Sequence, residues 1–286
     1  IVVSIVSLLL LFSVSGAAQH LDSAKREALE AKLAEYFEAL KYESLDVQKE
    51  EADFLIESTS DSLVRQFVAC TVYDHFIDSP VMGSEAVAVH VYDRWFAPGK
   101  VKMKNDMDLF NARIFADFNR QSLIGEKAPE LVMESVDGGQ VELFTEADKS
   151  GRYRVLFFYD ADCAKCKLES IMLSNILETE DIPIDFVAIY AGDNRQKWDS
   201  YVDGRLSFEV SRTKVLHLWD PTLDSDFQRK YGVLQTPRMF LVRPDRVIIG
   251  RGLDTQALSM MLHGIFDDVQ LEYGSEESET MFEEIL

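Results

Sequence analysis

Residues 155–167 have the sequence VLFFYDADCAKCK, in which an apolar run is followed by two cysteines three positions apart. The apolar run predicts a buried strand, and the residues after the cysteines predict a helix. Cys163 would then lie at a helix N-terminus, where free N–H groups and the helix dipole favour a thiolate. Cys166 would lie one turn further on, where it can attack a mixed disulfide and release the partner. The stretch therefore predicts a dithiol/disulfide redox switch.

Composition sets broad limits on the function. The chain has 286 residues, 47% of them hydrophobic, which suffices for one large domain or two ordinary ones. Its formal net charge is −21, and it has no cluster of Lys and Arg, so nucleic acid is not an expected partner. We expect no cofactor. We also expect no metal site, because one CxxC supplies only two thiolates and a second Cys or His pair is missing.

The first 18 residues have the features of a targeting segment. Residues 1–14 are apolar apart from serines, and residues 15–18 (SGAA) offer small side chains for cleavage before Gln19. We predict a signal peptide over 1–18. An uncleaved membrane anchor is the alternative, although the apolar run is shorter than the ~20 residues that a span needs. Export would place the three cysteines in an oxidising compartment and leave at least one of them unpaired.

Residues 19–122 are predicted to form a small all-α domain. Apolar residues recur there at helical spacing, and Asp78-Ser79-Pro80 and Pro98-Gly99 interrupt the pattern. The predicted helices cover residues 22–46, segments within 50–78, 84–95 and 107–118.

Three residues of this part could carry chemistry. Cys70 lies on an apolar helix face and is either a third redox thiol or a buried small hydrophobe, and we favour the second interpretation. His75 and His90 lack the spacing of metal ligands, so we predict structural roles for both.

Strand-like and helix-like segments alternate over residues 123–268. This order predicts an α/β sheet with helices on both faces. Residues 269–286 are predicted to be an acidic C-terminal extension. The predicted segments are a hairpin over 130–144, strands over 154–160, 184–190 and 215–219, helices to about 177, from 193 and over 223–231, a hairpin over 239–250 and a helix over 255–266.

This order resembles the thioredoxin-like superfamily, in particular its TlpA/ResA-like branch of thiol–disulfide oxidoreductases. Three motifs carry the resemblance: IGEKAP at 124–129, the Cys163-x-x-Cys166 pair and YGVLQTP at 231–237. The resemblance implies that Pro237 is a cis-proline packed beside the dithiol and that Thr236 contacts the substrate backbone. From the residues alone, Thr236-Pro237 is an X-Pro bond ahead of an apolar strand, where cis is a minority state.

The helical part has a resemblance of its own. Residues 73–85, YDHFIDSPVMGSE, are similar to a domain of uncharacterised function that precedes thioredoxin modules in envelope proteins of Gram-negative bacteria. This resemblance implies a location in the periplasm or cell envelope, and it assigns no chemistry to the helices.

The chain departs from the thioredoxin pattern at several positions. Asp162 replaces the usual Trp before the first cysteine, and Phe157 stands where thioredoxins keep a buried Asp for proton transfer. Some other group must then accept the proton of the resolving thiol. Glu169 is a candidate, although we favour an exposed position on the helix surface for it.

The leading prediction is an exported thiol–disulfide oxidoreductase. Cys163 would attack protein disulfides, Cys166 would resolve the mixed disulfide, and a membrane partner would supply electrons. The oxidase direction stays open. A binding or scaffolding protein with a structural disulfide is the alternative from another class. A thiol peroxidase is disfavoured, because peroxiredoxins keep Thr or Ser and Pro where this chain has Asp160 and Leu156.

Overall fold

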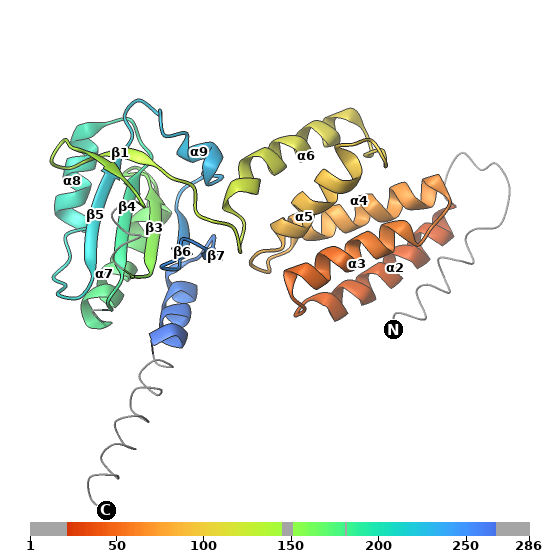
Figure 1. The fold of residues 1–286 in the computed structure, drawn as a ribbon, viewed down its shortest axis with the longest axis horizontal. Coiled ribbons are helices and arrows are strands. Elements are labelled where there is room, and N and C mark those ends of the chain that lie inside the picture. Colours follow the sequence, from red (N-terminus) through yellow and green to blue (C-terminus); the bar gives the residue numbers. More distant parts are fainter. Residues whose placement is uncertain (1–21, 145–150, 181, 267–286) are drawn as a thin grey trace, which may run out of the picture. The chain divides into compact units, whose positions relative to one another are not determined.

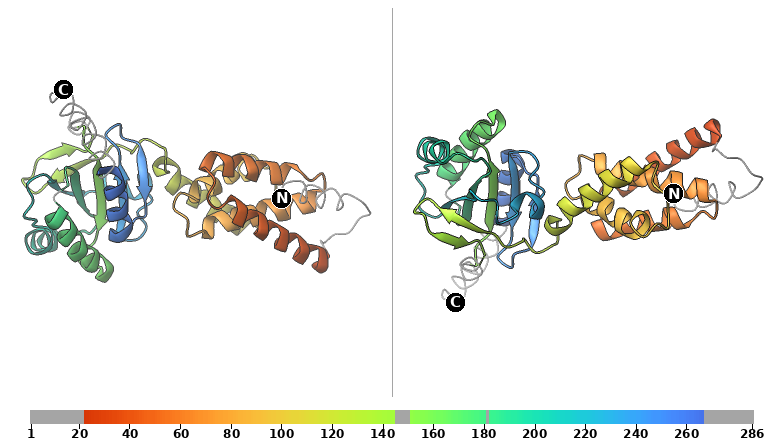
Figure 2. Two further views of the ribbon diagram at one scale, coloured as in Figure 1. Left: turned by 90° about the horizontal axis from the view of Figure 1, so that it is seen from below. Right: turned by 90° about the horizontal axis from the view of Figure 1, so that it is seen from above.

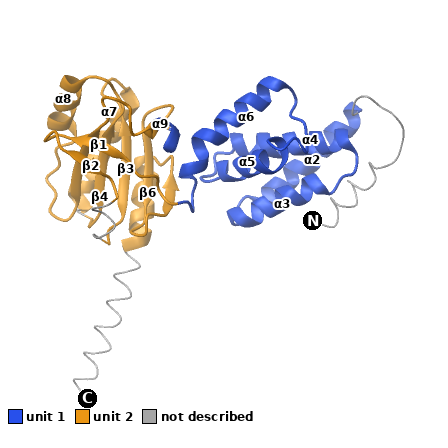
Figure 3. Ribbon diagram, turned by 45° about the horizontal axis from the view of Figure 1, so that its top comes forward, with its two compact units in different colours: residues 1–126, 228–232 blue, residues 127–227, 233–286 orange. Residues whose placement is uncertain are grey.

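The structure, a computed structural model, describes residues 22–144, 151–180 and 182–266. The predicted signal peptide and the predicted acidic extension lie outside these residues. The chain divides into two compact units, residues 1–126 with 228–232 and residues 127–227 with 233–286 (Figure 3). The predicted domain boundaries at 18, 122 and 268 stay predictions. Among the residues described, no helix has the length and apolar character needed to cross a bilayer.

The first unit is built from helices around one apolar core. α4 packs against α2, α3 and α5 (Figures 1 and 2). Its elements are α2 (Ser23–Leu40), α3 (Leu45–Glu57), α4 (Ser62–Asp78), α5 (Glu85–Val91), the π-helical turn η1 (Tyr92–Phe96), α6 (Asp106–Asn119) and the 3-10 turn η2 (Arg120–Ser122).

The single helix predicted over 22–46 is wrong in its last part, because α2 ends at Leu40 and α3 begins at Leu45. The physical reason is an N-cap at Ser44, whose hydroxyl accepts the backbone N–H of Val47 at 3.3 Å. A Ser ahead of an apolar run is a known start signal, and the sequence prediction passed over it. The predicted break after Asp78 is confirmed, since α4 ends there.

The second unit contains a seven-stranded sheet in the order β2-β1-β5-β4-β3-β6-β7 (Figure 1). The central strands β3, β4 and β5 are parallel, and the remaining pairs are antiparallel. The strands are β1 (Val132–Ser135), β2 (Gln140–Glu142), β3 (Arg154–Tyr159), β4 (Asp185–Tyr190), β5 (Lys214–Trp219), β6 (Arg238–Val242) and β7 (Ile248–Arg251).

Helices cover both faces of this sheet, so the predicted fold class is confirmed. α7 (Ala164–Glu180) connects β3 to β4, and α8 (Arg195–Arg205) connects β4 to β5. Both connections move in the same direction across the sheet. Right-handed crossovers therefore place both helices on one face, where the helix over 255–266 joins them in the same apolar core. On the opposite face, Phe227 at the start of α9 stacks on Phe158 of β3 with ring centroids 5.7 Å apart.

The helix predicted over 223–231 is shorter than expected, because α9 covers only Phe227–Lys230. Leu223 and Asp226 have positive φ angles of 60° and 56°, which no right-handed helix accommodates. The carboxylate of Asp220 holds this loop by accepting the backbone N–H groups of Asp224 and Ser225. Phe227 and Tyr231 are the buried apolar side chains of the stretch for which the longer helix was predicted.

Candidate redox site

Cys163 occupies the N-cap position of α7, directly after the buried strand β3. Its carbonyl accepts the first backbone bond of the helix, from Lys167 N–H at 3.2 Å. Its Sγ accepts the backbone N–H of Cys166 at 3.1 Å, as a Ser hydroxyl does at an ordinary N-cap. The sulfur therefore lies at the positive end of the helix dipole. Cys163 is half-buried, so a partner can reach its sulfur.

Cys166 lies on the inner face of the same helical turn and is fully buried in the sheet core. Burial raises the pKa of the Cys166 thiol to about 12, while hydrogen bonds with the Asp160 backbone and Thr236 act in the opposite direction. At neutral pH this thiol is protonated. The two cysteines therefore differ in environment: Cys163 is partly exposed, and Cys166 is buried.

Thr236 and Pro237 lie beside the dithiol. The thiol of Cys163 lies 3.4 Å from the carbonyl oxygen of Thr236 and donates to it. The Thr236–Pro237 peptide bond is cis, and β6 begins at the next residue, Arg238. The structure thus brings together residues that are 73 positions apart in the chain. Leu234, two positions before Thr236, exposes 67% of its surface on this loop.

An ion pair that the sequence analysis did not find includes Asp162, the residue directly before Cys163. Asp162 Oδ2 lies 2.5 Å from Lys197 Nζ, which comes from the first turn of α8. The hydrogen bond from Lys197 lowers the pKa of Asp162. Both residues also line an open pocket of about 420 Å³, together with Tyr201 and Arg205. Because these residues are 35 positions apart, only the βαβ geometry could have revealed the pair.

Glu169 is not the exposed helix-surface residue that the sequence favoured. It is 5% exposed, and its carboxylate accepts hydrogen bonds from the backbone N–H and the hydroxyl of Thr255. The helix over 255–266 packs on the same face of the sheet as α7, and this packing buries the carboxylate. Phe157 is fully buried in β3 and stacks on Tyr159, so no carboxylate occupies that position beneath the dithiol.

The remaining candidates lie in the first unit. Cys70 is buried as predicted, with Sγ 3.9 Å from the sulfur of Met103, and burial raises its pKa to about 11. His90 Nε2 lies 3.0 Å from the Asp53 carboxylate, and His75 stacks on a Phe ring. Within the described part of the chain, no three His, Cys, Asp or Glu side chains are arranged to hold a metal ion.

Comparisons with known proteins agree with this geometry. Residues 124–251 match the AhpC/TSA family, and this segment contains both cysteines and Thr236-Pro237. No curated protein sequence matches the chain. Among solved structures, a thioredoxin-like protein from Bacteroides caccae shares 17% identity at a TM-score of 0.61 and covers 82% of this chain and 83% of its own.

Two further structures match about half of the chain at lower scores. A thiol-disulfide oxidoreductase from Bacteroides fragilis shares 20% identity at a TM-score of 0.43, covering 49% of this chain and 99% of its own. The thioredoxin domain of a thiol-disulfide oxidoreductase from Bacteroides vulgatus shares 18% identity at a TM-score of 0.42, covering 50% of this chain and 96% of its own. The match at a TM-score of 0.61 shows a thioredoxin-like fold, and residues 124–251 are similar in sequence to the AhpC/TSA family, so the predicted resemblance is confirmed.

Proposed function

We propose that the protein is an exported thiol–disulfide oxidoreductase that acts on protein thiols and disulfides through Cys163 and Cys166. The observation that carries this proposal is the difference in environment between the two sulfur atoms. Cys163 caps α7 and is partly exposed, whereas Cys166 is buried and protonated. A dithiol catalyst needs one accessible nucleophile and one sheltered resolving thiol. A disulfide that merely braces a fold needs no such difference.

The reductive direction takes two balanced steps. The Cys163 thiolate attacks one sulfur of a substrate disulfide, the substrate S–S bond breaks, and the other substrate sulfur leaves as a thiolate that takes up a proton. Cys166 then loses its proton and attacks Cys163. This second attack forms the Cys163–Cys166 disulfide and releases the second substrate thiol. The substrate gains two electrons, which the protein loses, and the oxidase direction is the same sequence reversed.

We assign the loop at Thr236 to substrate binding. The Thr236 carbonyl accepts from the Cys163 thiol at 3.4 Å, so a substrate backbone that reaches Cys163 must pass beside this residue. Leu234, 67% exposed on the same loop, offers an apolar contact to the substrate. An extended segment of the substrate would lie along this loop with its cysteine at Cys163.

The second step requires a group that accepts the Cys166 proton, and we assign this role to Glu169. The two residues are i, i+3 neighbours on the buried face of α7. Glu169 also has a buried carboxylate, and general bases in such steps are carboxylates or imidazoles. Its bonds to Thr255 would hold the carboxylate in place and shift as the proton arrives.

We further propose that the protein works in the periplasm or cell envelope after export by residues 1–18. The resemblance of residues 73–85 to an envelope domain and the apolar character of residues 1–14 support this location. In such a compartment, a reductant needs electrons from elsewhere, and a membrane partner would supply them.

The first experiment is the reduction potential of the Cys163–Cys166 pair, measured by equilibration with dithiothreitol and thiol trapping. A value near ~−270 mV or moderately higher, with fast exchange, is expected of a catalytic dithiol. Cys163→Ser should abolish disulfide reduction of insulin, and Cys166→Ser should accumulate mixed disulfides. Cys70→Ser is the matched control and should leave the potential unchanged.

The same measurement separates the proposal from the scaffold alternative. A potential well below ~−300 mV with slow exchange is the property of a structural disulfide, and that result would favour a binding protein. For the peroxidase alternative, hydrogen peroxide consumption is the assay. We expect none above background, because Leu156 stands at the Pro position of peroxiredoxins and Asp160 at their Thr or Ser position.

A further inference from the structure

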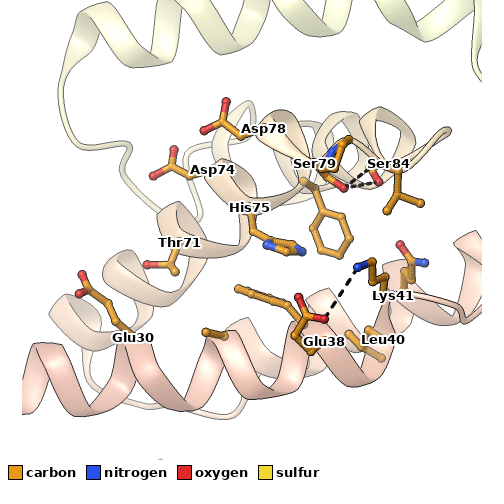
Figure 4. A pocket seen from close by; sticks show the side chains of 16 residues that line it. Glu30, Glu38, Leu40, Lys41, Thr71, Asp74, His75, Asp78, Ser79 and Ser84 are labelled. Carbon is orange, nitrogen blue, oxygen red and sulfur yellow. Dashed lines mark hydrogen bonds and ion pairs between the residues drawn. The ribbon is translucent and has the colours of Figure 1, made fainter. Parts of the chain in front are cut away.

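The first unit contains a groove of about 580 Å³ between α2 and α4 that the redox chemistry does not use (Figure 4). Its lining includes Asp74, His75, Asp78, Ser79 and Ser84. These five residues belong to the 73–85 stretch, on which the helical part resembles a domain of uncharacterised function. The stretch that carries this resemblance, residues 73–85, therefore forms one wall of the groove.

The floor of the groove is apolar and aromatic. The imidazole of His75 stacks on the ring of Phe37 with centroids 4.0 Å apart and an interplanar angle of 13°. It meets Phe76 edge-on at 5.0 Å. Burial lowers the pKa of His75, so the floor carries no charge at neutral pH. Apolar side chains of a ligand could lie on this floor without burying an unpaired charge.

The walls of the groove carry an excess of negative charge. Four carboxylates line it, and Lys41 is the one ammonium group among the residues that line it. The carboxylates are those of Glu30, Glu38, Asp74 and Asp78.

The cations near these carboxylates do not remove the excess. Lys41 lies 3.9 Å from Glu38, while Arg26 and Lys104 pair with Glu30 and Asp74 without lining the groove. Three of the four carboxylates thus have a cation within 4 Å, and a net excess of one negative charge remains, with Asp78 outside these three ion pairs. A ligand that enters the groove therefore meets a field that modestly favours positive charge.

The shape of the groove fits a chain segment. Its lining residues run from Glu30 of α2 to Lys41, the residue directly after α2, and Figure 4 shows these two side chains toward opposite ends of the view. From Glu30 to Lys41 there are eleven residue steps, which correspond to about 16 Å along a helix axis. An extended peptide covers that length with about five residues.

We propose that this groove binds a short basic amphipathic segment of a partner protein. Its apolar side chains would lie over Phe37 and Phe76, and its Lys or Arg side chains would face Glu38 and Asp78. The chain's own C-terminal residues do not fit, because residues 267–286 contain eight acidic residues and no Lys or Arg. This site is independent of the dithiol, so the redox function can fail without affecting it.

The test uses the full chain and an array of labelled hexapeptides in which Lys or Arg alternates with Leu or Phe. Counterpart arrays replace the basic residues by Glu or the apolar residues by Ser. We expect binding of the basic amphipathic peptides only. The double variant Glu38→Lys/Asp78→Lys should weaken it at least about tenfold. Ala34→Trp, at an exposed position that lines the groove, should weaken it without changing charge.

The matched control is Glu27→Lys/Glu35→Lys, which changes two exposed carboxylates of α2 that do not line the groove. This control should bind as the parent does. Equal losses in the control and the groove variant would mean that net charge alone attracts the peptides, and the proposal would be wrong. Failure of every basic peptide to bind, or tighter binding of a peptide with the 267–286 sequence, would also overturn it. Insulin reduction should be the same in all these variants.

Discussion

The backbone N–H of Cys166 lies 3.1 Å from Sγ of Cys163 and donates to it. This bond fixes the first sulfur over the end of α7 and at the same time turns the second thiol into the core. The helix thus places Cys163 at its N-terminus and buries Cys166 in the core, as the proposed roles of nucleophile and resolving thiol require. Both properties come from the placement of two cysteines at the N-cap and N3 positions of a single helix.

The two cysteines of the reduced protein should differ strongly in reactivity. At pH 8, we expect iodoacetamide to modify Cys163 at least about tenfold faster than Cys166, because only thiolates react and burial raises the pKa of Cys166 to about 12. The Cys166 rate should then rise about tenfold per pH unit until about pH 12. Trypsin cleaves after Lys165, so mass spectrometry can follow the two cysteines separately.

The control for this experiment is the same reaction in denaturant. There both thiols lose their folded environments, and the two rates should converge. Equal rates in the native protein would show that Cys166 is not sheltered, and the inequality on which the proposed function depends would be absent.

Replacement of Glu169 by Gln should slow the second redox step specifically. The amide keeps the shape and an acceptor oxygen for Thr255, but it cannot take the Cys166 proton. We expect at least a tenfold slower release of mixed disulfides in single-turnover experiments, with the first attack by Cys163 unchanged. Glu178→Gln, at an exposed position on the same helix, is the control. A purely structural Glu169 would leave the ratio of the two rates unchanged.

Much of the second unit followed from the sequence, and the reason is physical. Apolar runs predicted β3 and β4, and the CxxC spacing placed both cysteines on the first turn of a helix. These are local signals. Glu169 and Lys197 required long-range information, because Thr255 buries the first and Asp162 pairs with the second. A charged residue on a helix is usually exposed, and nothing in the local sequence of Glu169 indicated otherwise.

The Lys197–Asp162 ion pair should support the nucleophile. Loss of the ammonium group in Lys197→Met leaves the Asp162 carboxylate unpaired next to Cys163, and a nearby negative charge disfavours a thiolate. We expect Cys163 to react about two to five times more slowly with iodoacetamide at pH 7. The double variant Asp162→Asn/Lys197→Met removes both charges and should restore the rate. If Lys197→Met slows the reaction and the double variant does not restore the rate, Lys197 acts through the shape of the site and not through its charge.

The sheet itself depends on a buried ion pair between two register partners. Arg154 of β3 lies opposite Asp185 of β4, with Nη2 and Oδ2 3.1 Å apart and both side chains nearly inaccessible. Arg152 adds a contact to the same carboxylate at 2.9 Å. Asp185→Ala should lower the free energy of unfolding by about 3–5 kcal/mol, because it leaves buried positive charge without its partner. Denaturant unfolding measures the loss, and Asp199→Ala, an exposed ion-pair position on α8, should change it by less than about 1 kcal/mol.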